Sequence, residues 1–512
     1  MKSFSKILCL VLACLMVAVC FASCNGDKET STDTKKPSTG SDTVDETGRN
    51  AIKDNVPTDL NYGGKQDVTF LYRNDVDLWK YELACEELLN DTLYDAIHYR
   101  NIDVENRLGV NIKTIGLDGS YSIISTWNQA LSTSVLTNTG DYDGAAIYAS
   151  QSSALAKDGI YYDFNMISKE YGNGYVNLEK PWWNQTLVSE LTTYGSLFFL
   201  AGDMLISETA QGYCLFFNKD LFNEKFPDAG ITSLYQTVKD GKWTIGLLTD
   251  YVSQVWDDNN SNGVIDDGDV MGWSALGGPA DGGMDCWIYS LGLNITEMNA
   301  FGEPELALIS NPNTIPAYEA VKKLYIGTQG SYGSSGLTAK CTETSLQNGN
   351  ELFGRVYLNH GASMRESTVN YGVLPMPKYE EDQEDYRTIF CNNSSFLVLC
   401  SNLTDEKAEV VGATIELLAA TSYKDVTPTY YSTVLQGIYS KDQPDAEMYD
   451  LILKSFVADF GFAYSTKSIA GVGSIFRDVS ASADIQQKID SNKTAYESAL
   501  ADLLTALESV SG

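Results

Sequence analysis

The sequence predicts an α/β protein built from more than one lobe, and three observations support this prediction. The chain has 512 residues, more than a single hydrophobic core usually organises. Between residues 67 and 149, short apolar runs alternate with amphipathic helical patterns, as in parallel strands joined by helices. After residue 65 there is no internal repeat and no long linker, so we expect the lobes to be interwoven along the chain.

The first region follows the order strand, helix, strand, helix, strand. Its strand segments are apolar and β-branched or aromatic, and its helical segments repeat apolar residues every three or four positions. The predicted elements are a strand over 67–72, a helix over 93–108 capped at Gly109, a strand over 110–116, a helix over 123–135 and a strand over 143–149. Ligands of such sheets bind at the carboxyl ends of the strands.

The second region is richer in aromatic residues. Thr314 is the expected N-cap of one of its helices, with Pro316 just inside. The predicted elements are aromatic strands in 194–203 and 212–222, helices over 243–256 and from Thr314, a strand pair formed by 371–376 and 394–400, and helices over 406–420 and 484–510. We expect the last of these helices to pack on the body of the protein.

The charge balance excludes several classes of partner. The formal net charge is −33 and the pI is near 4.3. Such a surface repels nucleic-acid phosphates and anionic lipid, which favours an exported protein with a neutral or cationic ligand. Only two histidines occur, His98 and His360, so histidine-based metal or acid–base chemistry is not expected.

The N-terminus predicts export and lipid attachment. Lys2 and Lys6 precede the apolar run ILCLVLACLMVAVCF, which leads into FASC at 21–24. This resembles a bacterial lipobox, in which Cys24 would be lipidated after cleavage, although Phe21 replaces the usual leucine. A plain secretory signal or an N-terminal anchor helix is the alternative. No other long apolar run occurs.

Residues 1–23 are therefore assigned to a signal peptide and residues 24–64 to a tether. The segment after Cys24 is polar, poor in aromatic residues and rich in Ser, Thr, Asp and Lys. A segment of this composition cannot bury enough apolar surface to fold, so we expect a flexible connection to the membrane.

Six cysteines remain outside the signal region and Cys24. None is spaced as CxxC, and several lie in apolar runs, where a free buried thiol is expected. Cys391 and Cys400 could instead bridge a hairpin. The six are Cys85, Cys214, Cys286, Cys341, Cys391 and Cys400.

At this point the chain resembles the extracellular solute-binding lipoproteins of ABC importers, in the family-1, maltose-binding-like group. The matching stretches, in the expected order, are VTFLYRND at 68–75, KPWW at 180–183, FFLAGD before YCLFFNKDLF, DGKWT at 240–244 and YGVLPMPKY at 371–379. In that family, a run like 216–221 marks the crossing into the second lobe. The resemblance covers the chain from about residue 65 to its end.

The resemblance implies a two-lobed periplasmic-binding-protein-like fold of type II, with lobes joined by a multi-strand hinge. The expected lobes are 65–205 plus 388–430, and 206–387 plus 431–512. It also implies a monomeric receptor, lipid-anchored on the outer face of the cytoplasmic membrane. This receptor would capture a small solute, expected to be an oligosaccharide, and deliver it to the membrane subunits of an ABC permease. A peptide or another solute is the alternative cargo.

The stretch WDDNNSNGVIDDGDV at 256–270 has the spacing of a calcium loop. Calcium needs six to eight oxygen ligands, which an alternating acidic loop brings to one point, and Gly263 permits the sharp bend. The expected ligands are Asp258, Asn260, Asn262, the backbone carbonyl of Val264, Asp266 and Asp269. No second loop pairs with this one, so we expect a structural ion rather than a sensor. An Asx-rich turn without metal is the alternative.

Cargo recognition is expected to depend on aromatic rings and planar polar groups. The chain has 31 tyrosines and eight tryptophans, and sugars offer C–H faces for stacking and hydroxyl groups for hydrogen bonds. The candidate ligand residues are Arg73, Asp75, Trp79, Ser150, Gln151, Trp182, Trp183, Asp203, Trp273, Trp287 and Arg365. For each aromatic residue the alternative is core packing, and for Arg73 and Asp75 it is a solvated pair.

An enzyme is not expected. The chain has no HExxH, GxSxG, Walker or GxGxxG motif. A glycoside hydrolase with two carboxylates remains an alternative, but with 68 acidic residues some pair will always look suitable. A secreted glycan adhesin is a second alternative, and it would lack hinge closure.

Overall fold

The computed structural model describes residues 48–168, 174–266, 268–276, 282–334, 343–480 and 482–511. The body of the chain is one compact unit, Asp45–Gly512. All described residues belong to this unit. The expected signal peptide, the expected lipidation site Cys24 and the thiol of Cys341 lie outside the described residues.

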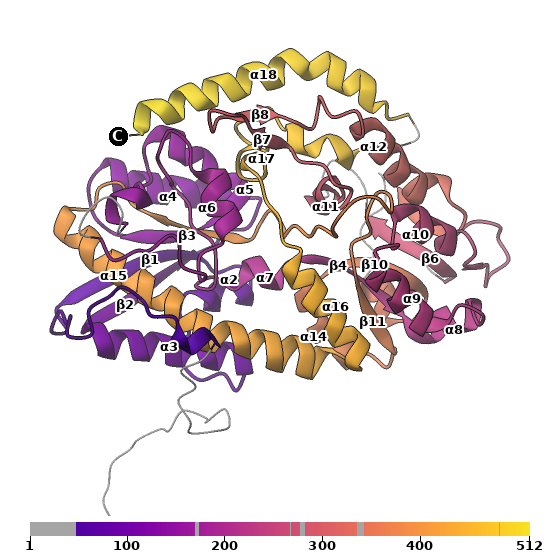
Figure 1. Ribbon diagram of the computed structural model, residues 1–512, viewed down its shortest axis with the longest axis horizontal. Helices are drawn as coiled ribbons and strands as arrows, with labels where there is room; N and C mark the ends of the chain where they lie inside the picture. Colours follow the sequence, from indigo (N-terminus) through magenta and orange to yellow (C-terminus); the bar gives the residue numbers. More distant parts are fainter. Residues whose placement is uncertain are drawn as a thin grey trace, which may run out of the picture. The chain divides into compact units, whose positions relative to one another are not determined.

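The first lobe is organised by a four-stranded sheet of order β12-β3-β1-β2 (Figure 1). The strands are β1 (Gln66–Arg73), β2 (Val110–Leu117), β3 (Gly144–Tyr148) and β12 (Ser395–Leu399). The strand β1 pairs in parallel with β2 and β3, whereas β12 runs antiparallel to β3. The sequence predicts the three parallel strands and the helices between them correctly.

Helices cover this sheet and begin and end where local chemistry predicts. The helix α3 (Thr92–Leu108) is capped by the Asp91 carboxylate and ends at Gly109, whose φ of 61° favours glycine and where a Cβ would lie 2.4 Å from the Oδ1 of Asn61. The helix α15 (Asp405–Thr421) packs against α3 and β1. The helix α4 (Ile124–Leu136) buries Trp127 and Leu131, as its four-residue repeat predicts.

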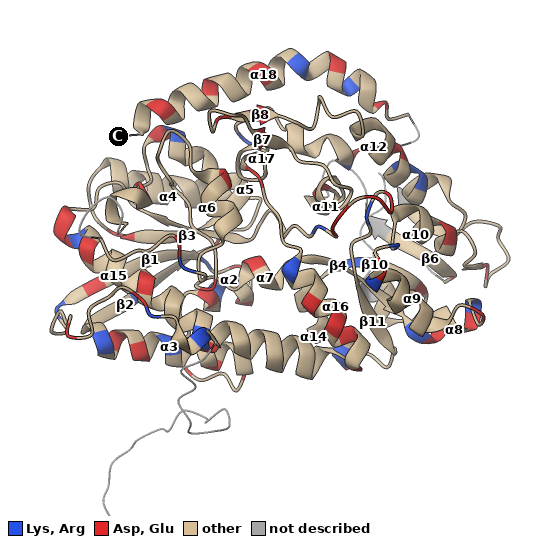
Figure 2. Ribbon diagram, viewed as in Figure 1, with Lys and Arg blue, Asp and Glu red and all other residues tan. Residues whose placement is uncertain are grey.

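The second lobe is organised by a mixed sheet of order β11-β4-β10-β6-β5, with β9 paired to β6. Its strands are β4 (Tyr213–Asn218), β5 (Trp256–Asp257), β6 (Val270–Leu276), β9 (Ser331–Ser334), β10 (Glu351–Tyr357) and β11 (Tyr371–Pro375). A separate pair is formed by β7 (Thr296–Met298) and β8 (Pro304–Leu306). Figure 2 shows charged residues mainly on helices, whereas β3 and β4 contain none.

Three segments of chain pass between the lobes and pair with one another. We call 211–213, 388–391 and 455–457 the crossing segments. The first pairs with the second at Gly212 and Phe390, and the second pairs with the third at Thr388 and Phe456. This is the multi-strand hinge that the sequence predicts.

The remaining helices fill the space around the two sheets. The α-helices are α2 (Asp77–Glu82), α5 (Ala149–Ser152), α6 (Gln185–Leu191), α7 (Ser207–Ala210), α8 (Lys219–Lys225), α9 (Gly230–Lys239), α10 (Ile245–Val252), α11 (Cys286–Ser290), α12 (Thr314–Lys322), α13 (Glu343–Gln347), α14 (Gly361–Glu366), α16 (Gln443–Lys454), α17 (Phe460–Tyr464) and α18 (Ile485–Val510). The 3-10 and π-helices are η1 (Gly48–Ala51), η2 (Ser153–Asp158), η3 (Phe164–Ile167), η4 (Gly282–Asp285), η5 (Lys323–Gly327), η6 (Leu358–His360), η7 (Ser422–Val426), η8 (Thr429–Tyr439) and η9 (Val472–Arg477).

The C-terminal helix α18 contacts elements of both lobes, as Figure 1 shows along one edge of the structure. It packs against η2, which follows the first sheet, and against α12 of the second lobe. Just before the helix, the carbonyl of Ala483 accepts a hydrogen bond from Lys322 of α12 at 2.7 Å. No described helix is long and apolar enough to span a bilayer.

Four expectations about local structure are corrected. Residues 194–203 form only isolated bridges, because the segment turns at Tyr194 and Gly195, which both have positive φ. The segments 371–376 and 394–400 are not a strand pair, since β11 and β12 lie in different sheets. The remaining two corrections concern Thr314 and the tether.

Thr314 is the first residue of α12 rather than its cap, and Asn313 holds the cap position. Part of the expected tether is packed against the body: Asp54 pairs with Arg107 at 2.8 Å and Val56 is buried. The five cysteines of the described residues are buried and form no disulfide, so Cys391 and Cys400 do not bridge a hairpin; they are Cys85, Cys214, Cys286, Cys391 and Cys400.

Candidate functional site

The two lobes meet through the edges at which their parallel strands end. Asn392 lies just before β12, and its amide donates to Asp285 of η4, which follows β6, at 3.4 Å. Asp285 also pairs with Arg477 of η9 at 2.5 Å. Carboxyl edges of strands are where α/β sheets bind ligands. We call this region the interlobe edge site, and it includes Arg73, Trp79, Tyr148, Gln151, Tyr213, Asp285, Tyr357, Cys391, Asn392 and Arg477.

Arg73 is the last residue of β1 and the central cation of this site. Its guanidinium lies 4.1 Å from the ring centre of Trp79 and 5.0 Å from that of Tyr148, so it is held between two aromatic faces. Its Nη2 donates to the carbonyl of Asn393 at 2.7 Å and to the hydroxyl of Ser395 at 2.9 Å. Its Nε and Nη1 have no hydrogen-bond partner in the structure. Burial lowers the pKa of Arg73 to about 10, so it stays protonated at neutral pH.

The loop after β2 makes room for Arg73 because it contains a glycine. A Cβ at Gly119 would lie 2.2 Å from the Cγ of Arg73, closer than any real contact. The same loop continues to Tyr121, whose side chain is 69% exposed. The Tyr121 hydroxyl is close enough to contribute to the raised pKa of Tyr148, which burial causes in the main. An exposed aromatic ring therefore stands beside the buried cation.

Below Arg73, a buried carboxylate connects it to a second arginine. Glu82 of α2 accepts hydrogen bonds from the hydroxyl of Ser395 and from the backbone N–H of Ser207, and burial raises its pKa. Arg100 donates to the backbone carbonyl of Glu82 at 3.3 Å. The charge of each arginine is partly balanced by Glu82, which fixes the base of the site.

The second lobe contributes two tyrosines and a thiol. The hydroxyls of Tyr213 and Tyr357 lie 3.3 Å apart, and each lies within hydrogen-bonding distance of the Cys391 thiol. Tyr213 begins β4 and Tyr357 ends β10, so both belong to one edge of the second sheet. Aromatic rings with hydroxyl, amide and guanidinium groups suit a ligand that is rich in hydroxyl groups.

The structure brings four predicted ligand residues to this site. Arg73 and Trp79 are in direct contact, and Ser150 and Gln151 follow β3 at the same edge. The Oε1 of Gln151 is buried without a partner. Asp75 is exposed in the turn after β1 and forms no ion pair with Arg73 in the described part of the chain.

Three other predicted ligand residues belong to the second lobe, and their role as ligand contacts stays a prediction. Trp273 and Trp287 are fully buried and pack on Tyr325, whose hydroxyl accepts from the Trp287 N–H at 3.2 Å. Arg365 lies on α14 and lines a separate cavity of about 600 Å³ with Asp91 at the start of α3.

Trp182, Trp183 and Asp203 lie together, but at a different cavity. Both indoles are buried, and both N–H groups donate to Glu416 of α15 at 3.3 Å. The indole rings are therefore packed in the core, which is the alternative to ligand contact for these two tryptophans. They line a cavity of about 430 Å³ together with Asp203 and Glu208, which we call the hinge cavity.

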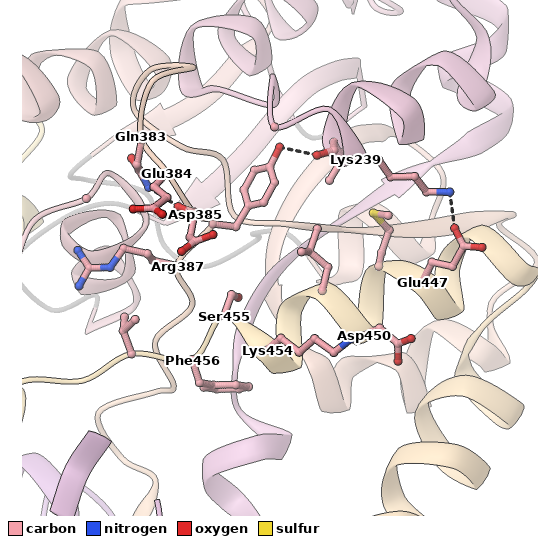
Figure 3. Close-up of a pocket in the computed structure, with 17 residues that line it drawn as sticks. Lys239, Gln383, Glu384, Asp385, Arg387, Glu447, Asp450, Lys454, Ser455 and Phe456 are labelled. Atoms are coloured by element: carbon pink, nitrogen blue, oxygen red, sulfur yellow. Dashed lines mark hydrogen bonds and ion pairs between the residues drawn. The ribbon is translucent and has the colours of Figure 1, made fainter. Parts of the chain in front are cut away.

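A larger cavity, of about 920 Å³, lies between α9, residues 383–387 and the end of α16 (Figure 3). Lys239 and Glu447 form an ion pair at its wall, and Tyr386 donates to the carbonyl of Val238. None of its lining residues comes from the first sheet. It therefore cannot hold a ligand between the two carboxyl edges.

Sequence reasoning missed several residues of the interlobe edge site. Tyr121 and Tyr148 follow or end predicted strands, so the rule of strand ends alone could have found them. Asn392 and Asp285 carry no such signal, because their proximity depends on how the crossing segments place the lobes. The missed residues are Tyr121, Tyr148, Tyr213, Asp285, Tyr357, Cys391, Asn392 and Arg477.

The expected calcium loop is closed by hydrogen bonds among its own residues, and calcium binding there stays a prediction. The Asp258 carboxylate accepts from the backbone N–H of Asn262 and of Gly263, at 3.1 and 2.7 Å, and Gly263 has a φ of 77°. The side-chain amides of Asn260 and Asn262 both reach Asp266. Rotating either amide by half a turn would place an oxygen at the same point.

Two features of the loop fit calcium less well. Asp269 is buried, and its oxygens accept from Trp256, from the backbone of Asn259 and from the backbone of Asp266, so it anchors the loop. No group of three His, Cys, Asp or Glu residues with metal-binding geometry occurs in the described part of the chain. A calcium ion here would depend on asparagine and backbone oxygens as well as carboxylates. The residues whose side-chain oxygen atoms could coordinate a calcium ion in this loop are Asp258, Asn260, Asn262 and Asp266.

The buried Glu416 should make the free energy of unfolding depend on pH. Burial raises its pKa to about 7 from the ordinary 4.5, so the folded protein keeps a proton that the unfolded chain releases between these values. Stability should fall as pH rises through this window. Glu416→Gln mimics the protonated acid and should remove the fall, a difference on the order of 3 kcal/mol between pH 4.5 and 7.5. Urea unfolding at several pH values measures it. The exposed Glu497→Gln is the control, and parallel profiles for wild type and Glu416→Gln would refute the assignment.

Comparison with solved structures supports the fold. No family model matches the chain, and no curated protein does. A cyclo/maltodextrin-binding protein complexed with maltotetraose aligns with a TM-score of 0.52 and 11% identity, covering 88% of this chain and 98% of that one. An ABC substrate-binding protein from Listeria monocytogenes in complex with cycloalternan aligns with a TM-score of 0.49 and 12% identity, covering 87% and 99%. The chain therefore has the two-lobed α/β fold seen in solute-binding proteins of the maltodextrin-binding type.

Proposed function

We propose that this protein is the solute-binding component of an ABC importer and that it captures an oligosaccharide between its two lobes. One observation carries the proposal: the carboxyl edges of the two sheets meet through Asn392 and Asp285, next to the crossing segments. A ligand at this edge would touch both lobes at once. The cyclo/maltodextrin-binding protein of similar fold was solved with maltotetraose, which supports the choice of a sugar.

The proposed mechanism is closure of the lobes on the cargo. Contacts from both lobes stabilise the closed state, and the permease recognises that state. The buried Arg73 keeps its position without the cargo, because Trp79, Tyr148 and Ser395 already hold it. Such preorganisation lowers the entropic cost of binding. The proposed role needs no bond-breaking step, so we propose a binding protein rather than an enzyme.

We also propose that Cys24 carries a lipid that anchors the protein on the outer face of the cytoplasmic membrane. The proposal is supported by the order of residues 1–24, in which basic residues come first, an apolar run follows, and small residues precede the cysteine. The loop from Asp258 to Asp269 is proposed to hold a structural calcium ion that orders the chain between α10 and β6, away from the cargo.

The cargo proposal is tested with the exposed Tyr121. Tyr121→Ala should weaken binding of a maltodextrin about 5- to 30-fold, because one stacking face is lost, while thermal stability stays within a degree. Titration calorimetry against mono- and oligosaccharides measures affinity. Leu136→Ala, which removes another exposed apolar side chain (73% exposed) from α4, is the matched control. The proposal fails if no saccharide binds and if the radius of gyration in solution is unchanged by any saccharide.

The calcium proposal predicts a metal-dependent melting temperature. At a calcium concentration a hundredfold above the dissociation constant, the folded state should gain about 2.7 kcal/mol, which chelator removes. Asp258→Ala should abolish this gain and leave saccharide affinity nearly unchanged. The exposed Asp502→Ala on α18 is the control. Identical melting of the wild type with calcium and with chelator would rule out the site.

The anchor proposal predicts that Cys24→Ala releases the protein from the membrane fraction. In cells fed a labelled fatty acid, the wild type should carry label and Cys24→Ala should not. Cys391→Ala, which removes a thiol of the folded body, serves as the comparison. Label that persists in Cys24→Ala would place the lipid elsewhere or point to an uncleaved anchor helix.

A further inference from the structure

The hinge cavity is a second candidate site, formed by different residues from the interlobe edge site. It lies between the backbone of 181–184, residues 202–209, residues 427–431 and the end of α16. Phe456 of the third crossing segment also lines it. At about 430 Å³ it is large enough for a small organic molecule and much larger than a single ion requires.

Two carboxyl groups, one buried and one half-buried, line this cavity without a cationic partner. Glu208 is 7% exposed; its Oε1 accepts a hydrogen bond from Asn184, and its Oε2 has no partner. Asp203 accepts a hydrogen bond from the hydroxyl of Thr427. Neither forms an ion pair with any residue that the structure describes. An acceptor that is buried and unpartnered carries a free-energy cost that a donor in the cavity would remove.

The electrostatics of the pair point to a positive ligand group. Burial raises the pKa of Glu208 to about 7, and the nearby Asp203 adds to this rise. Burial also raises the pKa of Asp203 to about 6. At neutral pH the cavity therefore holds acidic groups whose ionised forms are penalised, and a cation beside them would favour ionisation.

The cations of the protein that reach the cavity do not fill this role. Arg49 and Lys454 both line it, but both side chains are exposed to solvent. Arg49 donates to the carbonyl of Tyr423 at 2.9 Å and lies over that ring, and its influence on Asp203 is smaller than that of burial. Exposed charges are screened by water and salt. The two carboxyl groups remain without a close counter-charge.

Aromatic residues complete the lining. The ring of Tyr430 is buried and borders the cavity, while its hydroxyl lies near Tyr94 and Tyr439 on the far side. Tyr431 and Phe456 add apolar surface. Aromatic faces attract cations. The cavity thus offers acceptors at one side and an apolar wall at another.

We propose that the hinge cavity binds a small organic molecule that carries a primary ammonium group. The ammonium would donate to the free Oε2 of Glu208 and supply the charge that both carboxyl groups lack, and its hydrocarbon part would contact Tyr431 and Phe456. A neutral polyol supplies donors but no charge. Because the lining comes from residues 181–184 on one side and from α16 on the other, the bound molecule would connect elements of both lobes.

The test is titration calorimetry of the folded protein with n-butylamine and with butan-1-ol, at constant ionic strength and neutral pH. The two probes share a carbon chain and differ in the ammonium group. We expect one n-butylamine to bind per protein, at least tenfold more tightly than butan-1-ol. Equal affinity for the two probes would overturn the proposal, as would an equal response to potassium chloride alone.

Variants assign the binding to this cavity. Glu208→Gln should weaken n-butylamine binding at least tenfold, and Asp203→Asn severalfold. The matched control is Glu351→Gln, which changes another buried carboxyl group with an unpartnered oxygen, in β10 of the second lobe. Its affinity should stay within twofold of the wild type. If Glu208→Gln does not fold, Asp203→Asn still decides. Unchanged affinity in the folded cavity variants, or an equal loss in Glu351→Gln, would refute the site.

Discussion

The hydrogen bonds that join the crossing segments set the position of both lobes. The backbone N–H of Tyr213 donates to the carbonyl of Ile389, and the backbone N–H of Cys391 donates to the carbonyl of Gln211, both at 3.0 Å. The backbone N–H of Val457 donates to the carbonyl of Thr388 at 2.8 Å. A paired strip of backbone resists shear and can still bend, which is what hinge closure requires. Tyr213 and Cys391, which also face the interlobe edge site, are therefore held by the hinge itself.

The buried carboxyl groups of the interlobe edge site and of the hinge cavity have different partners. At the interlobe edge site, Glu82 lies between Arg73 and Arg100, so a buried anion has two cations near it. The arrangement keeps Arg73 between its aromatic neighbours before any ligand arrives. In the hinge cavity, Glu208 has an amide and a hydrophobic surround instead. Buried ionic groups cost free energy unless they are paired, so only the first arrangement is complete within the chain.

Local patterns in the sequence predict local structure well in this protein. The Gly109 cap, the β1–β3 parallel strands and the periodic face of α4 all depend on neighbours within a few residues, and the structure confirms them. The pairing of 371–376 with 394–400 is wrong because both segments are buried, apolar strands, and nothing in them specifies a partner strand. The turn at Tyr194 overrides the strand propensity of the run that follows it.

The candidate site is predicted only where a residue's role follows from its position on one strand. Arg73 is at a strand's carboxyl end, and that fact alone places it correctly. Trp182 and Trp183 have the composition of a sugar site, but their indoles point to Glu416, and composition does not reveal direction. Asn392 and Asp285 lie 107 residues apart in sequence. Their contact depends on the hinge geometry, which no short motif encodes.

The contrast between Glu82 and Glu208 also argues for separate roles of the two sites. Under the proposed function, the interlobe edge site must release its ligand, so its own charges are best satisfied without the ligand, as Glu82 is. A site whose carboxyl group lacks a counter-charge gains more from each occupancy, because binding then removes a cost that the free protein bears. Glu208 lies four residues before Gly212, where the first crossing segment pairs with the second. Under our proposals, a cation in the hinge cavity would therefore neutralise a buried carboxyl group that is close in sequence to the backbone pairing that joins the lobes.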